Sequence, residues 1–272
     1  HGLEVTLNYV KTGKIAMDDL VGGKAQFANI VETNIAFAGY QQPPIQVIAN
    51  IEKVYDAAII GRKDKGINRP EDLKGKKIGI MLATTSQIYA DRLLAAYHIP
   101  KDQVTMVGLL PPAMQSALLE GSSVDAISLW QPYIYNVQNQ LKDNASLFVD
   151  RSVYTGYMAL AGNKGFITAN PQTTRNLLAA YIDAEQFLRA NPQESKQIVA
   201  RVLSLGRPVV DAIWDQYAFD IRLQKELYNA TVDEGKWVQD TQKDFAGKPL
   251  PDYSLFFNAE PLRQIDSMRV KW

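Results

Sequence analysis

Two stretches of the chain place hydroxyl, amide and aromatic side chains directly after short apolar runs. Thr84, Thr85 and Ser86 follow the run 76–83, and Trp130, Gln131 and Pro132 follow Val124–Leu129. Hydroxyls donate hydrogen bonds, and an indole offers a flat apolar face with one N–H donor. Ligands of open α/β sheets bind beyond the carboxyl ends of the strands. The pattern therefore predicts a site that binds a small molecule, although Trp130 has an equal reading as a core aromatic and one hydroxyl is needed to cap a helix.

A third loop, at residues 29–33, has the same position after a predicted strand. It supplies Asn29, Val31, Glu32 and Thr33 and precedes a short apolar helix. A carboxylate in a binding cleft repels anions and suits an amine, an amidine or a protonated heterocycle. The other reading of Glu32 is a first-turn acid that the helix dipole stabilises. Tyr154 is the remaining predicted contact, either packed over a ligand ring or packed in the sheet.

Signatures of catalysis are missing from the sequence. The chain has no cysteine and only two histidines, which excludes thiol nucleophiles and thiolate metal sites and argues against a histidine-rich zinc site. His98 follows a helical run and precedes Ile99-Pro100, so it is interpreted as a helix C-terminal residue. There is no G-x-S-x-G, P-loop or dinucleotide fingerprint. We expect no enzyme activity, no cofactor and no metal.

Composition restricts the partners. The 272 residues include 29 basic and 29 acidic side chains, and this balance argues against a nucleic-acid surface. No run approaches the roughly 18 apolar residues of a membrane span. The length suits two domains, or one domain with a large insertion.

Strand and helix patterns alternate along the first half of the chain, as in an α/β sheet. Residues 62–150 are predicted to form a βαβαβ unit, and helices are predicted to dominate after residue 165. Alternation predicts a strand over Leu3–Val10, and Arg222–Asn229 is predicted to be helical. Because His1-Gly2 leads directly into the first strand, we expect the chain to be a fragment or a processed product with its upstream part missing.

Several motifs occur in the order known from one family. They are the segments 23–29, 67–79, 113–121, 124–133 and 181–192. Together they resemble the substrate-binding proteins of nitrate, taurine and alkanesulfonate ABC importers (the NMT1/THI5-like family), which share a fold with thiamine-pyrimidine synthases. The resemblance covers essentially the whole chain.

The resemblance implies an α/β, two-lobed type II periplasmic binding protein fold, each lobe a mostly parallel sheet flanked by helices. Lobe one would comprise 1–58 and 157–272, and lobe two 59–156. A solute would be held in the cleft between the lobes by residues at the predicted loops: Asn29, Val31, Glu32, Thr33, Thr84, Thr85, Ser86, Trp130, Gln131, Pro132 and Tyr154.

The chain departs from the family pattern at three places. Family members usually carry Gly where this chain has Ala83, and small residues or Pro near Glu32 to Asn34, which argues against the usual sulfonate or nitrate. The family also begins with a strand and a helix, about 25–35 residues for one βα unit, that precede Gly2.

The function implied is an extracytoplasmic solute-binding protein that delivers a small organic molecule to an ABC permease. Trp130 and Glu32 favour a nitrogen-containing or aromatic solute, and a sulfonate is the alternative. A monomer at the periplasmic or extracellular face of a bacterial membrane is expected. Two rivals are a ligand-sensing receptor domain and a pyrimidine-synthase-like enzyme, for which His98 is poorly placed.

Overall fold

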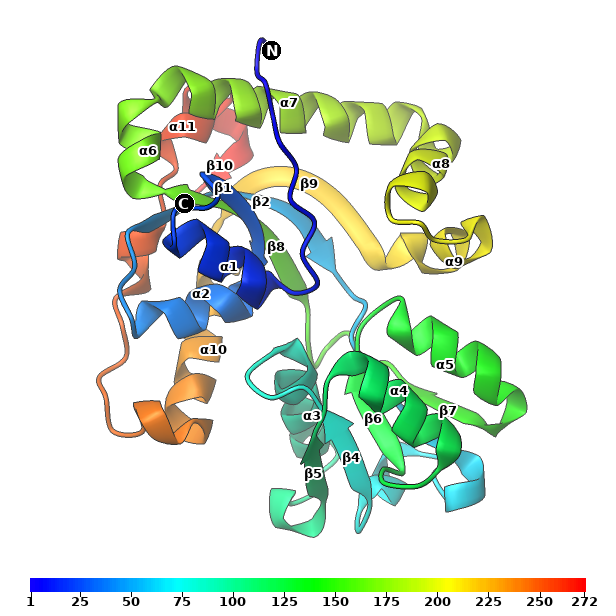
Figure 1. Cartoon of the computed structure of the whole chain (residues 1–272). Helices are drawn as coiled ribbons and strands as arrows, with labels where there is room; N and C mark the ends of the chain where they lie inside the picture. Colours follow the sequence, from blue (N-terminus) through cyan, green and yellow to red (C-terminus); the bar gives the residue numbers. More distant parts are fainter. The chain divides into compact units, whose positions relative to one another are not determined.

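The computed structural model describes residues 1–272, and the chain divides into two compact units. Unit 1 comprises His1–Lys53, Gly156–Gln197 and Ala218–Trp272, and unit 2 comprises Val54–Thr155 and Ile198–Tyr217. Each unit contains one five-stranded sheet with helices around it (Figure 1). The α/β prediction is confirmed.

The sheet of unit 1 has the order β1-β8-β2-β9-β10. β1 runs antiparallel to β8, with Asn29 opposite Leu160, whereas β9 and β10 are parallel. Its apolar core includes the fully buried Leu20, Ile30 and Ile48. Its strands are β1 (Phe27–Val31), β2 (Ile45–Val54), β8 (Gly156–Asn163), β9 (Tyr217–Gln224) and β10 (Val270–Lys271).

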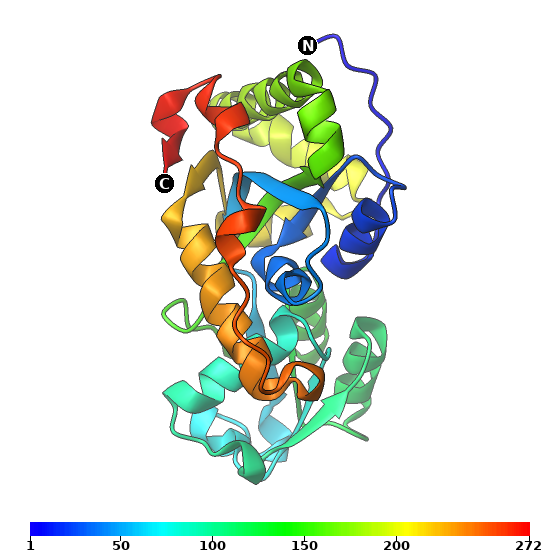
Figure 2. The same cartoon turned by 90° about the vertical axis from the view of Figure 1, so that its left-hand side faces the viewer.

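The helices of unit 1 pack on this sheet and on one another. Gly39 and Gly235 leave the space that the Tyr253 ring occupies between two of these helices, α2 and α10. Figure 2 shows the chain after α10 returning alongside that helix. The helices are α1 (Gly13–Val21), α2 (Glu32–Gly39), α6 (Lys164–Ala169), α7 (Pro171–Ala190), α8 (Pro192–Val202, which continues into unit 2), α10 (Lys225–Thr241) and α11 (Glu260–Arg263).

The sheet of unit 2 has the order β5-β4-β6-β3-β7. β4 is parallel to both β5 and β6, whereas β3 is antiparallel to β6 and β7. The sheets of this protein are therefore mixed in direction. The strands of unit 2 are β3 (Ala58–Arg62), β4 (Lys77–Ile80), β5 (Thr105–Gly108), β6 (Ala126–Leu129) and β7 (Ala145–Phe148).

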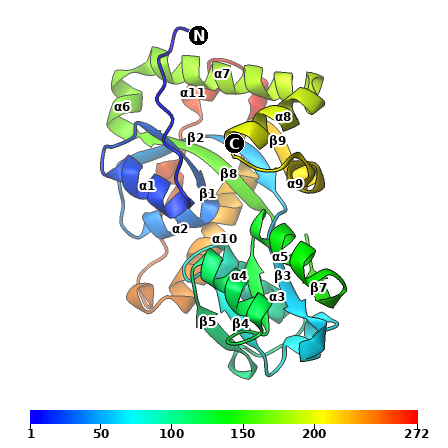
Figure 3. The same cartoon turned by 45° about the vertical axis from the view of Figure 1, so that its right-hand side comes forward.

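Four helices complete unit 2, and their ends follow from local sequence. Pro111 and Pro112 occupy the first turn of α4, and Gly121 ends it in the left-handed conformation. α5 packs beside β7 (Figure 3). The helices are α3 (Thr85–Ala96), α4 (Pro111–Glu120), α5 (Tyr133–Leu141) and α9 (Arg207–Ile213).

Residues 198–217 belong to unit 2, although the sequence analysis placed them in lobe one. The Tyr55 amide donates to the Gln216 carbonyl at 2.8 Å, and the Tyr217 hydroxyl is 3.0 Å from an Asp56 carboxylate oxygen. These bonds connect the two segments of unit 2. The lobe boundaries 1–58, 59–156 and 157–272 stay a proposal.

One predicted element, the strand Leu3–Val10, is wrong, and the helix predicted over Arg222–Asn229 is wrong only at its start, since Lys225–Asn229 belong to α10. Leu3–Val10 forms no strand, and its Val5, Leu7 and Tyr9 side chains are exposed. Alternation gives a strand only where a neighbouring backbone supplies hydrogen bonds, and this segment has no strand partner in the structure. Arg222–Gln224 belong to β9 rather than to a helix, because pairing with β10 outweighs their local preference.

Candidate functional site

Two of the three predicted loops lie at one edge of the unit 2 sheet. β4 and β6 are neighbours and parallel, with Ile78 opposite Ala126 and Gly79 opposite Ile127. The carboxyl ends of both strands therefore meet at the same edge. The loop 81–86 leaves one strand there, and the loop 130–132 leaves the other. The structure thus brings together hydroxyls and an aromatic that are more than 40 residues apart in the sequence.

The hydroxyls of Thr84 and Ser86 have structural partners. Thr84 is the N-cap of α3, and its Oγ1 accepts from the Ser86 amide and donates to the Met81 carbonyl. The Ser86 hydroxyl donates to the Ser128 carbonyl at 2.5 Å, and the Ser128 hydroxyl donates to the Ser86 carbonyl at 2.7 Å. This reciprocal pair joins the first turn of α3 to β6. The two hydroxyls position the loop, which makes Thr85 the hydroxyl most available to a ligand.

Thr85 lies beside the predicted Tyr154. The two hydroxyl oxygens are 3.4 Å apart, and the Tyr154 side chain is buried. The Tyr89 ring meets Tyr154 edge-on at 6.3 Å, and the Arg92 guanidinium lies 5.7 Å from the Tyr154 ring centroid. Tyr154 is therefore held in place from two sides. Its ring has a fixed position beside the N-terminus of α3.

Tyr89 holds the Tyr154 ring in position, and the ionisation of Tyr89 predicts a pH dependence of stability that can be tested. Its hydroxyl donates to the Phe148 carbonyl and accepts from the Asp150 amide, and burial raises the pKa of Tyr89 to about 12. Between pH 10 and 12 the unfolded chain loses the phenolic proton while the folded chain keeps it, so stability falls as the pH rises. We expect the free energy of unfolding to drop between pH 9 and 11 by about 1 kcal/mol more in the wild type than in Tyr89→Phe. Urea titrations at both pH values measure this, and equal drops would contradict the assignment.

Ala83 has a left-handed backbone, with φ of 57°. This is the position where the resemblance leads one to expect Gly, the residue that adopts this conformation without a steric cost. Its amide donates to the Gln87 side chain, which holds the loop despite the Cβ. The loop therefore keeps, with Ala83, the left-handed conformation that a Gly at this position would favour.

Trp130 is half-buried at the end of β6. It packs on the apolar core of unit 2 and meets Tyr133 edge-on at 6.3 Å. Because Trp130 is not fully buried in the core, part of its side chain is accessible to a ligand. Gln131 donates through Nε2 to Gln216 and accepts through Oε1 from the Tyr135 amide. The Gln131-Pro132 bond is cis, and Pro132 precedes α5.

The third predicted loop is not a loop in the structure: Asn29 and Val31 lie in β1, and Glu32 and Thr33 lie in the first turn of α2, which follows β1 directly in unit 1. The Glu32 side chain is fully buried, and its Oε2 accepts from the Tyr157 amide at 2.7 Å. Glu32 is the only acid in the first turn of α2, as the dipole reading predicted. The Val31 amide donates to Asn34 Oδ1, so Val31 has a backbone role at the helix start.

Asn29 in β1 and Thr33 in α2 are the other two residues predicted to contact a ligand in unit 1. Asn29 Oδ1 accepts from the Tyr181 hydroxyl at 3.0 Å. Burial raises the pKa of Tyr181, while the bond to Asn29 opposes this. The Thr33 hydroxyl is buried without a hydrogen-bond partner, which is unusual for a polar atom. Local sequence does not mark the Tyr181 contact, because its hydroxyl meets Asn29 only through tertiary packing.

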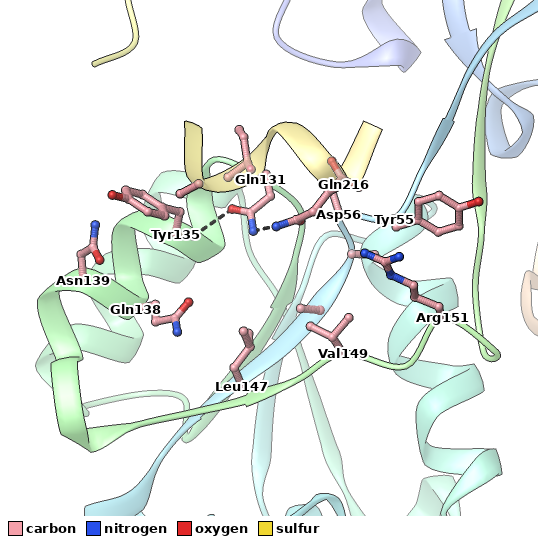
Figure 4. Close-up of a pocket in the computed structure, with 14 residues that line it drawn as sticks. Tyr55, Asp56, Gln131, Tyr135, Gln138, Asn139, Leu147, Val149, Arg151 and Gln216 are labelled. Atoms are coloured by element: carbon pink, nitrogen blue, oxygen red, sulfur yellow. Dashed lines mark hydrogen bonds between the residues drawn. The ribbon is translucent and has the colours of Figure 1, made fainter. Parts of the chain in front are cut away.

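Unit 2 also contains a cavity of about 310 Å³ that sequence reasoning missed (Figure 4). Gln131 is the only predicted ligand residue among its lining residues. The other polar groups there come from segments with no motif, including Asp56, Arg151 and Gln216. No local pattern marks them, since they meet only through the fold.

Two further features concern metal and membrane. No cluster of three or more His, Asp or Glu side chains could hold a metal ion. No helix has both the length and the apolar character needed to cross a bilayer. His98 lies just beyond α3, with φ of 54°, as the helix-end interpretation of this residue implied.

A family comparison decides the relationship. The NMT1/THI5-like family model matches residues 1–195, which is more than half of the chain. The chain belongs to the NMT1/THI5-like family. A curated relative, the taurine-binding periplasmic protein of Escherichia coli K12, is 28% identical over 190 residues, or 68% of this chain. The alignment spans 58% of that relative, and the chain covers less than two thirds of the first curated relatives it matches.

Solved structures with a fold similar to that of this chain include binding proteins and an enzyme. The periplasmic aliphatic sulphonate binding protein SsuA from Escherichia coli matches with a TM-score of 0.77 and 18% identity, covering 90% of this chain and 84% of SsuA. The desulfurization enzyme DSZB matches with a TM-score of 0.62 and 16% identity, covering 89% of this chain and 86% of the enzyme. These likenesses confirm the fold.

Proposed function

We propose that this chain is an extracytoplasmic solute-binding protein that delivers a small organic molecule to an ABC permease. The observation that carries the proposal is the match of residues 1–195 to the NMT1/THI5-like family, together with the 28% identity to a taurine-binding periplasmic protein. The geometry supports it, since a helix N-terminus, the Thr85 hydroxyl and aromatic side chains lie at one sheet edge. This arrangement suits hydrogen bonding and stacking rather than bond cleavage.

The residues proposed to contact the solute are those of the three predicted loops, with Thr85, Trp130 and Tyr154 as the principal contacts in unit 2. In unit 1 the buried hydroxyl of Thr33 lacks a partner and Asn29 is exposed, so these two are preferred over Val31 and Glu32. The name of the taurine-binding relative favours a sulfonate. Glu32 was the reason to expect a cationic solute, and its carboxylate accepts a hydrogen bond from a backbone amide instead. A nitrogen-containing or aromatic solute is the alternative. A monomeric, periplasmic or cell-surface protein without enzyme activity is part of the same proposal.

A thermal-shift screen tests this proposal. The panel contains taurine, alkanesulfonates, nitrate, pyrimidines, amines and aromatic acids, each incubated with the whole chain. Ligand at about 100 times its dissociation constant stabilises the folded state by about 2.7 kcal/mol. We expect a shift from one chemical class, with the compound recovered unchanged by mass spectrometry. Recovery of a converted product would favour the enzyme alternative, and no shift from any class would contradict the proposal.

A further inference from the structure

The unit 2 cavity contains an arginine that forms no ion pair, Arg151. The Arg151 side chain is exposed and forms no ion pair; its guanidinium lies over the Tyr55 ring, 4.8 Å from the centroid. This contact positions the guanidinium while leaving its N–H groups available. The other charged group in the cavity, Asp56, already accepts from the Tyr217 hydroxyl. Arg151 is therefore the charged side chain of the cavity that forms no ion pair, whereas the Asp56 carboxylate is held by the Tyr217 hydroxyl.

The rest of the lining combines amide donors with an apolar surface. Gln131 donates to Gln216 Oε1, which leaves the Gln216 amide nitrogen without a hydrogen-bond partner. Figure 4 shows these two amides on one side of the cavity and Leu147 and Val149 on the opposite side. Leu147 is 37% exposed and Val149 is 51% exposed, so a molecule in the cavity would cover apolar surface that now meets water.

We propose that this cavity is a second binding site, for a small organic monoanion, which shares only Gln131 with the proposed solute site. Its carboxylate or sulfonate would pair with the Arg151 guanidinium, which offers two parallel N–H donors to such a group. Its short apolar part would contact Leu147 and Val149. The volume of about 310 Å³ is at the small end of the range for ligand cavities and accommodates a small organic molecule.

Several residues that line the cavity lie in the sequence next to points where the chain passes from one unit to the other. Tyr55 and Asp56 follow the first passage of the chain into unit 2, Arg151 precedes its return at Thr155, and Gln216 precedes the later return at Tyr217. All three of these connecting segments line the cavity.

The test uses butyrate as the probe and n-butylamine as the cation of similar size. Methyl NMR of the whole chain follows the resonances of Leu147, Val149 and Ile213, all of which line the cavity. We expect saturable shifts with butyrate and none with n-butylamine. Arg151→Gln should raise the dissociation constant for butyrate at least ten-fold. Arg201→Gln removes an equal charge from another exposed arginine of unit 2 that does not line the cavity, and it should leave the constant unchanged.

Trp130→Ala separates this site from the proposed solute site. Unchanged butyrate binding in that variant supports a distinct cavity site, whereas its loss would place the anion at Trp130 and overturn the proposal. Equal binding of butyrate by the wild type and Arg151→Gln, equal shifts with n-butylamine, or the absence of saturable shifts would overturn it as well. None of these outcomes depends on whether the screen for a transported solute succeeds.

Discussion

Trp130→Ala is expected to weaken binding of the solute found in the screen by roughly 30- to 1,000-fold. Truncating an aromatic anchor of a binding site costs about 2–4 kcal/mol, and every 1.4 kcal/mol is a factor of about ten. Trp130 is half-buried at the end of β6, so part of its surface is available to a ligand while the rest packs on the core. Isothermal titration calorimetry of wild type and variant with the same solute measures the change.

Two variants control this measurement. Trp130→Phe keeps a flat ring and should retain most of the affinity. Trp272→Ala removes a tryptophan of unit 1 that packs against Phe257 and Tyr228, and it should leave the affinity unchanged. Because Trp130 also contacts the core, the unliganded stability of each variant is measured beside the affinity. Wild-type affinity in a folded Trp130→Ala protein would remove Trp130 from the site.

Glu185→Ala is expected to lower the free energy of unfolding by about 3–5 kcal/mol, the cost of breaking a buried ion pair by removing one partner. The Glu185 side chain is 4% exposed and receives Arg269 at 2.6 Å, Arg189 at 2.7 Å and the Ile221 amide at 3.2 Å. The variant leaves the Arg269 guanidinium, itself largely buried, without this carboxylate. The C-terminal segment then loses a connection to α7 and β9.

Asp18→Ala is the matched control for Glu185. Its ion pair with Lys14 has the same 2.7 Å separation as Arg189 with Glu185, but both side chains are more than half exposed. Exposed pairs contribute about 0.2–1 kcal/mol, so this variant should change little. Urea unfolding followed by circular dichroism compares the three proteins. Similar losses in both variants would mean that burial of Glu185 contributes nothing.

The sequence alone was informative where the signal is local. The apolar run Val124–Leu129 contains β6, and the hydroxyls at 84–86 include the N-cap of α3. Such elements can be read because neighbouring residues carry both the periodicity and the capping groups. The motifs also identified the family, and the position of two predicted loops after strands was correct.

Other features were decided by the tertiary structure. Leu3–Val10 has strand alternation without a strand, because pairing requires a partner that local sequence cannot supply. The partners of Ser86 and Glu32 are Ser128 and the Tyr157 amide, 42 and 125 residues away along the chain. The α/β class, the start of α3 and the family could all be predicted from local sequence. Local sequence could not predict which hydroxyls form hydrogen bonds within the protein, where Arg151 lies or which carboxylates are buried. Each of these depends on groups distant in sequence that folding brings together.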